Sequence, residues 1–305
     1  MAPVEEIVAR LAARLGPPTG APESLDGGIT NRNYRMRFGA EDYVIRLPGK
    51  DTGLLSISRE AERIAGSAAA ALGIAPELVA AEPDCTVTRY LRARPLSPGE
   101  LASNPEPVAR VLRLFHDSGV RLPACFWVPD LLEEYARVAI ERGGELPDTY
   151  ARTREIAGRI AAVLPLSDPA PCHNDLLPAN LLALESDDGA PAEPRVPMLV
   201  DWEYAGMGHR LFDLGNFAVN NELDPQAEDR LLEAYFGEPP DASRRAALAL
   251  MRIMSDAREA AWGVVQSVIS ELDFDFGGYA AQHFGRLAET ASGLRLEEWL
   301  VAAAA

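Results

Sequence analysis

The chain has 305 residues, and its 29 Lys and Arg against 46 Asp and Glu give a formal net charge of −17 at pH 7. With 48% apolar residues, 25% charged residues and only 24 Gly and 24 Pro, the composition excludes disordered and fibrous classes and suits one large domain or two lobes. Because the surface is strongly anionic, it repels nucleic acid and favours cationic partners, or metal ions that hold anionic ones.

The three cysteines, Cys85, Cys125 and Cys172, show no spacing typical of a zinc site or a disulfide framework. They predict a reducing, cytoplasmic environment. The amino terminus lacks the basic and apolar segments of a secretion signal, and no apolar run is long enough to span a bilayer. We therefore expect a soluble protein that is not inserted in a membrane.

The first ninety residues predict a small antiparallel sheet with one packed helix and an amphipathic helix in front of it. Apolar residues recur at helical spacing in some segments and alternate with polar residues in others. The predicted elements are a helix over 4–15, strands over 33–38 and 43–47 joined by a turn at 39–42, a helix capped by Ser56 or Ser58 and ending at Leu72, and a strand over 86–88.

The pattern after about residue 105 is mainly helical. An acidic, Pro-rich segment over 185–197 predicts an exposed loop between two short strands, and the second of these is the apolar run 198–200. We find neither an internal repeat nor a flexible linker. The later helices are expected over 226–236, 243–255, 256–272 and 279–294.

The strongest local signal is an H-x-D-x4-N pattern within residues 172–180. It has the offsets of the protein-kinase catalytic loop, with Asn174 in the place of arginine. Phosphoryl transfer needs a carboxylate near the acceptor hydroxyl, and nearby a neutral oxygen that binds metal without repelling phosphate. Asp175 and Asn180 meet these two requirements.

Asp201 follows the apolar run 198–200, where a strand end gives a rigid mount for a metal-binding carboxylate. On its own, H-x-D-x4-N is equally compatible with a coincidental polar turn. Together with Asp201 it favours a phosphoryl-transfer site. In that interpretation His173 is a buried scaffold residue, and Cys172 is a small apolar filler.

Upstream, the Gly27–Gly28 turn precedes the first hairpin strand, where backbone N–H groups can lie over phosphates, although such a turn is more often only a turn. Arg46 lies opposite the apolar face of its strand, and Glu60 begins the next helix. An arginine and an orienting glutamate at these places fit phosphate binding. The alternative is a solvated arginine and a surface glutamate. We place Glu62 on a different helix face.

These residues resemble the choline/ethanolamine kinases, which belong to the aminoglycoside-phosphotransferase-like branch of the protein-kinase fold. Arginine rather than lysine at position 46 is typical of this family. The resemblance covers most of the chain and rests on segments 27–31, 43–49, 73–76, 172–182, 201–204, 212–216, 262–266 and 279–284.

The resemblance implies a two-lobed α+β fold, with a nucleotide-binding lobe over 1–91 and a mainly helical catalytic and acceptor-binding lobe over 92–305. It makes Asp175 the catalytic carboxylate at the acceptor hydroxyl, and Asn180 and Asp201 the catalytic Mg²⁺ ligands. The other residues it assigns are the scaffold acid Asp213 and the nucleotide contacts Gly28, Asn31, Arg46, Glu60 and, in an interlobe hinge, Arg89, Tyr90 and Leu91.

For the acceptor, the resemblance implies a cation held among Tyr204, Trp262 and Tyr279, each ring face contributing about 0.5–2 kcal/mol. Helix packing is the commoner role of such aromatic residues. Two departures from the family pattern argue against a complete binding cage for choline. Val265 occupies the position at which the family has a second tryptophan, and residues 220–221 occupy the position of a Glu-Trp pair. A smaller amine, or an alcohol of another shape, therefore stays open.

The motifs and the resemblance together predict transfer of the γ-phosphate of ATP, with Mg²⁺, to the hydroxyl of an amino alcohol, and the resemblance implies choline or ethanolamine. A kinase of the same fold acting on an aminoglycoside, a sugar or a thiamine-type cation is the first alternative. A non-catalytic nucleotide-binding module that regulates a partner is the second. The sequence leaves open the choice between ATP and GTP and the oligomeric state, for which a homodimer is one option.

Overall fold

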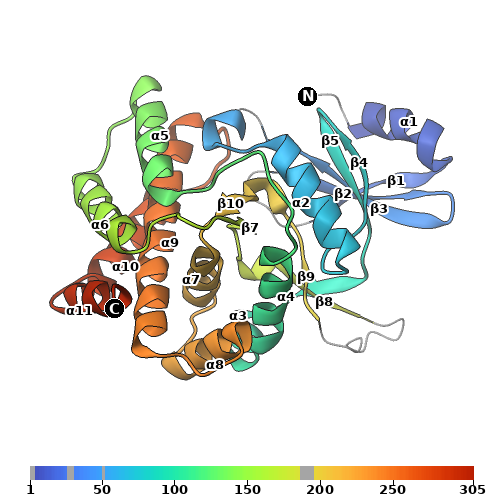
Figure 1. Ribbon diagram of the computed structural model, residues 1–305. Helices are drawn as coiled ribbons and strands as arrows, with labels where there is room; N and C mark the ends of the chain where they lie inside the picture. The colour runs from blue at the N-terminus through green and yellow to red at the C-terminus, as the bar shows by residue number, and fades with distance from the viewer. Residues whose placement is uncertain (1–3, 26–30, 50–51, 186–195) are drawn as a thin grey trace.

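The computed structural model describes residues 4–25, 31–49, 52–185 and 196–305, and Figure 1 shows a sheet beside a larger, mainly helical part. This arrangement confirms the predicted α+β class. The sheet is antiparallel throughout, with strand order β1-β2-β3-β5-β4. Its strands are β1 (Pro18–Leu25), β2 (Arg32–Phe38), β3 (Glu41–Leu47), β4 (Leu78–Glu82) and β5 (Cys85–Arg89).

The β2–β3 hairpin follows the predicted alternation, because Ile45 and Leu47 are buried while Arg46 lies on the other face. Strand β3 begins at Glu41, so the turn is shorter than the predicted 39–42. Strand β1 was not predicted, since as an exposed edge strand it carries no apolar alternation. Helix α1 (Val4–Leu15) covers the sheet, which has an apolar core of its own.

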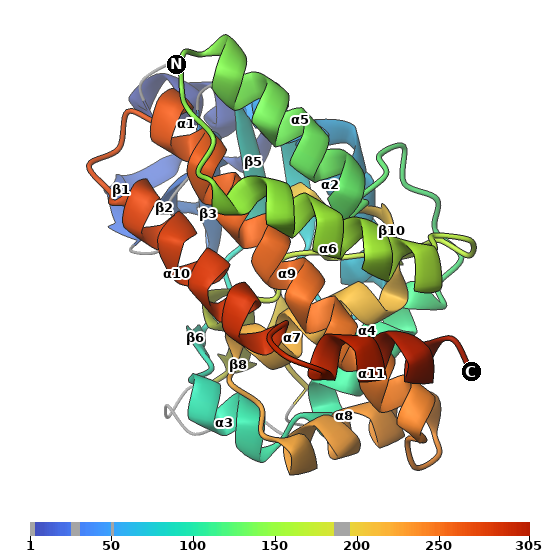
Figure 2. The same cartoon turned by 90° about the vertical axis from the view of Figure 1, so that its left-hand side faces the viewer.

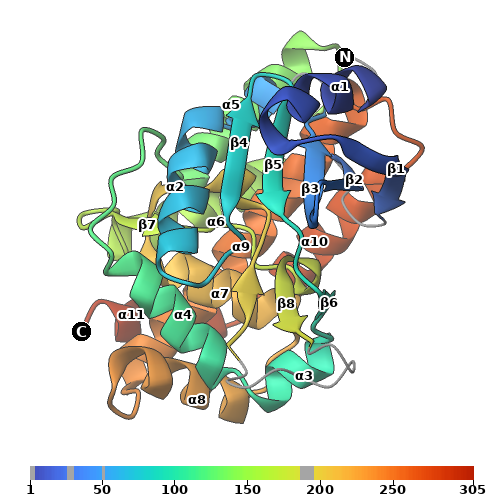
Figure 3. The same ribbon diagram turned by 90° about the vertical axis from the view of Figure 1, so that its right-hand side faces the viewer.

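Helix α2 (Arg59–Ala71) begins as predicted, with the Ser58 side chain accepting a hydrogen bond from the N–H of Ala61. Figure 3 shows it beside β4. Its buried face nevertheless belongs to the core of the helical part, because Ala61 and Ala65 cluster with Leu176 and Leu199. The helix is therefore joined by apolar packing to the segment that carries the H-x-D-x4-N pattern.

The remaining elements form the helical part and two small sheets, one of order β6-β8-β9 and one pairing β7 with β10. The predicted loop over 185–197 falls between β8 and β9, largely outside the described residues. The elements are η1 (Thr52–Leu55), β6 (Ala93–Pro95), α3 (Pro98–Ser103), α4 (Glu106–His116), α5 (Val128–Glu141), α6 (Thr149–Val163), β7 (Ala170–Cys172), η2 (Pro178–Asn180), β8 (Leu181–Leu184), β9 (Met198–Leu199), η3 (Trp202–Tyr204), β10 (Gly206–Gly208), α7 (Arg210–Asn220), α8 (Pro225–Phe236), α9 (Ala242–Ile269), α10 (Phe276–Thr290) and α11 (Arg295–Ala303).

Helix α9 is one continuous helix, and the prediction of two helices over 243–255 and 256–272 was wrong. The charged residues Asp256, Arg258 and Glu259 interrupt its apolar pattern, yet all three are buried. Figure 2 shows α9 among α5, α6, α10 and α11, and α7 packs against it as well. Because neighbours surround it, the helix buries residues around most of its circumference.

Helices α7 and α9 approach closely at Gly215. A Cβ atom on this residue would lie 2.6 Å from the carbonyl carbon of Met251. Nearby, the Asn216 side-chain amide donates to Ser255 Oγ (2.9 Å), which fixes the two helices relative to each other.

Among the helices described, none has both the length and the apolar character needed to cross a membrane.

Candidate active site

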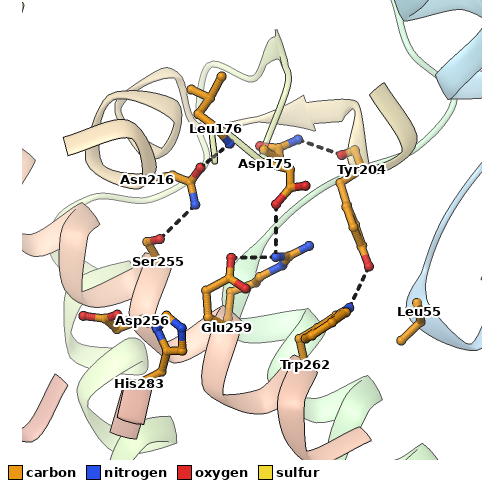
Figure 4. A network of polar contacts seen from close by, with 12 residues as sticks. Leu55, Asp175, Leu176, Tyr204, Asn216, Ser255, Asp256, Glu259, Trp262 and His283 are labelled. Atoms are coloured by element: carbon orange, nitrogen blue, oxygen red, sulfur yellow. Dashed lines mark hydrogen bonds and ion pairs between the residues drawn. The ribbon is translucent and has the colours of Figure 1, made fainter. Parts of the chain in front are cut away.

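Side chains of α7 hold the loop that follows β7 (residues 173–177). The carboxylate of Asp213 accepts hydrogen bonds from the backbone N–H groups of His173 (2.8 Å) and Asn174 (2.7 Å), and Asn216 Oδ1 accepts one from Leu176 (2.6 Å; Figure 4). These bonds confirm that Asp213 braces the loop. Asn174 has a φ of 67°, a left-handed conformation that asparagine tolerates better than most residues. The loop geometry thus follows from side chains far along the chain.

His173 is a scaffold residue, as predicted. Its ring is fully buried, packs at 4.5 Å from the Trp202 ring and forms a hydrogen bond to the carbonyl of Val200 (3.0 Å). Burial lowers the pKa of His173, which keeps the ring neutral. Its role is to hold the loop beside the strand that ends at Asp201.

Asn180 and Asp201 lie side by side with Asp175. The Asn180 amide donates to the Asp175 carboxylate (3.1 Å) and to its carbonyl (2.9 Å), while Val200 N–H donates to the Asn180 carbonyl (3.1 Å). Asp201 has a φ of 64°, a strained conformation of the kind that occurs at functional sites. The three residues that the sequence selected are therefore brought together by the loop and the end of β9.

Arg46 points from β3 to Asp201 and forms ion pairs with Asp201 and Glu62. The prediction that Glu60 orients Arg46 was wrong, because Glu60 is exposed. Two residues along a helix rotate the side chain by about 200°, so Glu60 and Glu62 face nearly opposite directions. The sequence analysis assigned the wrong face of α2 to the protein interior. In the structure, Glu62 and Ala61 lie on the buried face of the helix.

A second arginine and a second acid extend this cluster. Arg59 Nη1 lies 2.7 Å from Glu62 Oε2 and 3.6 Å from Glu203 Oε2, and the Asn31 amide donates to Glu203 (3.1 Å). Burial, and then the charge of Asp201, raise the pKa of Glu203. The sequence analysis missed Arg59 as a site residue. Gly28, by contrast, lies outside the described residues, so its predicted role stays a prediction.

The predicted hinge follows β5. Arg89 N–H donates to the Glu77 carbonyl (2.9 Å), and Tyr90 N–H donates to the Asp42 carbonyl (2.9 Å). These two N–H groups are thus already used within the N-terminal part of the chain. The nucleotide contacts of Arg89, Tyr90 and Leu91 stay predictions.

On the opposite side of Asp175, α9 contributes a buried charge pair that the sequence analysis missed. Arg258 Nη1 lies 2.6 Å from Glu259 Oε1 and 3.6 Å from Asp175 Oδ1, and the guanidinium lies 4.1 Å from the Tyr204 ring centroid. Both residues are only 2% exposed. Charged residues inside a mainly apolar stretch of helix were the available signal, because such residues are seldom buried without a partner.

The three predicted acceptor-site rings lie around this pair, and Figure 4 shows two of them, Tyr204 and Trp262, near Glu259. Trp262 Nε1–H donates to the Tyr204 hydroxyl (2.7 Å), and the Tyr279 hydroxyl donates to Glu259 Oε2 (2.8 Å). The ring centroids of Trp262 and Tyr279 are 5.5 Å apart in an edge-to-face arrangement. Val265 is fully buried and adds no ring. The rings and the acid thus form one cluster beside Asp175.

The electrostatics of Asp175 follow from its burial. Loss of solvation raises the pKa of this carboxyl well above its usual value, Arg258 opposes the shift, and the negative charge of Glu259 adds to it. A carboxylate with a raised pKa, held by an amide and facing an aromatic and acidic cluster, can accept the proton of a bound hydroxyl.

A two-lobed kinase-like fold with this loop, these clustered carboxylate and amide side chains and these arginines is that of a phosphotransferase. The sequence profile of the phosphotransferase enzyme family matches residues 23–249, so the chain belongs to this family.

The chain is 27% identical over 276 residues to protein LicA of Haemophilus influenzae, covering 85% of this chain and 76% of that protein. It is 25% identical over 317 residues to a choline/ethanolamine kinase of Homo sapiens, covering 85% and 77%. A crystal structure of a choline/ethanolamine kinase family protein from Mesorhizobium loti superposes with a TM-score of 0.80 at 29% identity over 99% of each chain. The resemblance read from the motifs, and the kinase-like fold, are confirmed.

Proposed function

We propose that the protein transfers the γ-phosphate of ATP to the hydroxyl of an amino alcohol, choline or ethanolamine. The observation that carries this proposal is the position of Asp175. It lies between the oxygen ligands Asn180 and Asp201 and the aromatic and acidic cluster of α9 and α10. An acceptor held by that cluster would present its hydroxyl to Asp175.

On the nucleotide side, Arg46 and Arg59 supply positive charge for phosphate oxygens, and Asn31 connects Glu203 to the N–H of Gly49. Asn180 and Asp201 fit Mg²⁺, which prefers oxygen ligands, because the bonded Asn180 amide nitrogen leaves its side-chain oxygen for the metal. When bound, the ion neutralises charge on the transferring phosphoryl group. We place the nucleotide lobe over 1–91 and the acceptor lobe over 92–305.

On the acceptor side, charge balance supports a cationic substrate. When Asp175 is ionised, Asp175 and Glu259 carry two negative charges and Arg258 one positive charge, all buried. A buried net negative charge is costly, and a bound monocation would offset it. The faces of Tyr204, Trp262 and Tyr279 add cation–π attraction. Asp175 would orient the hydroxyl and receive its proton as the oxygen attacks the γ-phosphorus.

A kinase acting on an aminoglycoside, a sugar or a thiamine-type cation would use the same nucleotide residues and differ only in the acceptor pocket. A non-catalytic module would bind ATP without turnover. A cytoplasmic location and a homodimer also stay predictions.

The test is ADP release with Mg-ATP and a panel of choline, ethanolamine, thiamine and an aminoglycoside, with Asp175→Asn as the blank. Turnover on choline or ethanolamine, absent in Asp175→Asn, is the expected result. Turnover only on thiamine or the aminoglycoside would mean that the acceptor is not an amino alcohol such as choline or ethanolamine. ATP binding without turnover on any compound would contradict the proposed function.

A further inference from the structure

Glu259 is the acidic residue that belongs to the aromatic cluster itself. It lies one helical turn before Trp262 on α9, and its two oxygens accept hydrogen bonds from Arg258 (2.6 Å) and the Tyr279 hydroxyl (2.8 Å). A carboxylate has about four lone-pair positions, and these contacts occupy two of them. Glu259 therefore keeps the capacity to accept further hydrogen bonds while its position is fixed.

Residues 220–221 are both asparagine, whereas the resemblance implies an acid in this pair. Asn221 instead supports the catalytic loop, because its amide donates to the carbonyl of Leu176 (3.2 Å). The negative charge beside the rings consequently comes from α9. Arg258 does not cancel it, since the same guanidinium also faces Asp175.

The rings alone give little selectivity between cations. The polar atoms of Trp262 and Tyr279 are used within the chain, so each ring offers only its face, and Val265 adds no further aromatic wall. A quaternary ammonium has no N–H and interacts with ring faces and with charge at a distance. An ammonium bearing an N–H can in addition donate a charge-assisted hydrogen bond to a carboxylate.

We propose that Glu259 determines acceptor specificity by accepting a hydrogen bond from the substrate ammonium, so that the enzyme prefers amino alcohols bearing at least one N–H over the quaternary choline. This inference rests on the proposed function, because it assumes an amino alcohol acceptor. It assigns Arg258 and Tyr279 the task of holding the carboxylate in place.

The experiment compares kcat/KM for ethanolamine, N-methylethanolamine, N,N-dimethylethanolamine and choline. For the wild-type protein we expect the three N–H compounds to exceed choline by about tenfold or more, the usual size of a hydrogen bond to a charged group. Equal values, or a preference for choline, would overturn the inference while leaving the proposed function intact. Failure of all four compounds would instead count against the proposed function.

Glu259→Gln tests the residue itself. We expect kcat/KM for the N–H compounds to fall about tenfold, choline to change less, and the KM for ATP to stay constant. The control is Glu298→Gln on the exposed face of α11, which should leave all four values unchanged. An equal loss on all four compounds in Glu259→Gln would show a packing role and overturn the assignment. If Glu259→Gln does not fold, the wild-type ratio of kcat/KM decides: a value for choline equal to or above the values for the N–H compounds would contradict the inference.

Discussion

The guanidinium of Arg258 lies 3.6 Å from the carboxylate of Asp175, in the buried space between α9 and the catalytic loop. This contact joins the proposed acceptor site to the proposed proton acceptor. It lets two carboxylates, Asp175 and Glu259, stand close together inside the protein, because one cation is shared between them.

The first prediction concerns the pH dependence of turnover. Asp175 must be ionised to accept a proton, so kcat/KM should fall as the pH drops through its raised pKa. Since Arg258 lowers that pKa, Arg258→Met should move the acid limb of the profile to higher pH. A profile of kcat/KM against pH, with circular dichroism as a check of folding, measures this shift. An unmoved acid limb in folded protein would mean that Arg258 does not act on Asp175.

The second prediction concerns Asp201. Asp201→Ala removes a carboxylate oxygen from the proposed metal site and should abolish turnover. It should also remove the gain in ATP affinity that Mg²⁺ gives the wild-type protein. Calorimetric titration of ATP with and without Mg²⁺ measures both affinities. A variant whose ATP affinity still rises with Mg²⁺ as in the wild type would refute the assignment.

The third prediction uses two glutamates of α2. Glu62 pairs with Arg46 and Glu60 is exposed, so Glu62→Gln should lower kcat/KM for ATP by about tenfold or more while Glu60→Gln leaves it unchanged. Both variants make the same chemical change two residues apart, which makes Glu60→Gln a matched control. The reverse ranking would restore the original sequence-based pairing.

The fourth prediction concerns stability. Gly215→Ala places a Cβ atom 2.6 Å from the Met251 carbonyl carbon, so α7 and α9 must separate. We expect a loss of about 1–3 kcal/mol in the free energy of unfolding, as for other overpacked sites. Urea denaturation measures it, and Gly158→Ala on α6, where a Cβ meets no atom within 4 Å, is the control. Equal stability of the two variants would show that the contact yields without cost.

The fifth prediction concerns Trp262. Trp262→Ala removes a ring face and the donor to Tyr204, so the KM for the acceptor should rise about tenfold while the KM for ATP changes little. Steady-state kinetics with each substrate varied in turn separates the two. An equal rise in both would indicate a general packing role for the ring.

Sequence reasoning reached the parts of the site that depend on spacing along the chain. Asp175 and Asn180 lie on one loop and Asp201 follows one short strand, so the spacing of these residues along the chain is enough to predict that they lie close together. Arg46 was found because strand alternation fixes its face. Its partner was misassigned because the rotational phase of α2 depends on packing against distant residues such as Leu176.

Arg258 and Glu259 of α9 were not predicted as site residues for a related reason. Arg258 and Glu259 look like solvated residues when only their own helix is considered, and their burial becomes visible only when Asp175, Tyr204 and Tyr279 arrive from other segments. Strand β1 escaped because an exposed edge strand is formed by backbone pairing with β2 and needs no apolar pattern.

The packing of α2 has a mechanical consequence. Its alanine face shares a core with the catalytic loop, whereas the sheet that carries Arg46 has a separate core. A rotation of the sheet would therefore carry Arg46 away from Glu62 and Asp201 and leave those two acids in register with Asp175. The ion pairs of Arg46 therefore connect two parts of the protein that have separate apolar cores, and breaking them would withdraw the proposed phosphate-binding arginine while the proposed catalytic carboxylate keeps its place.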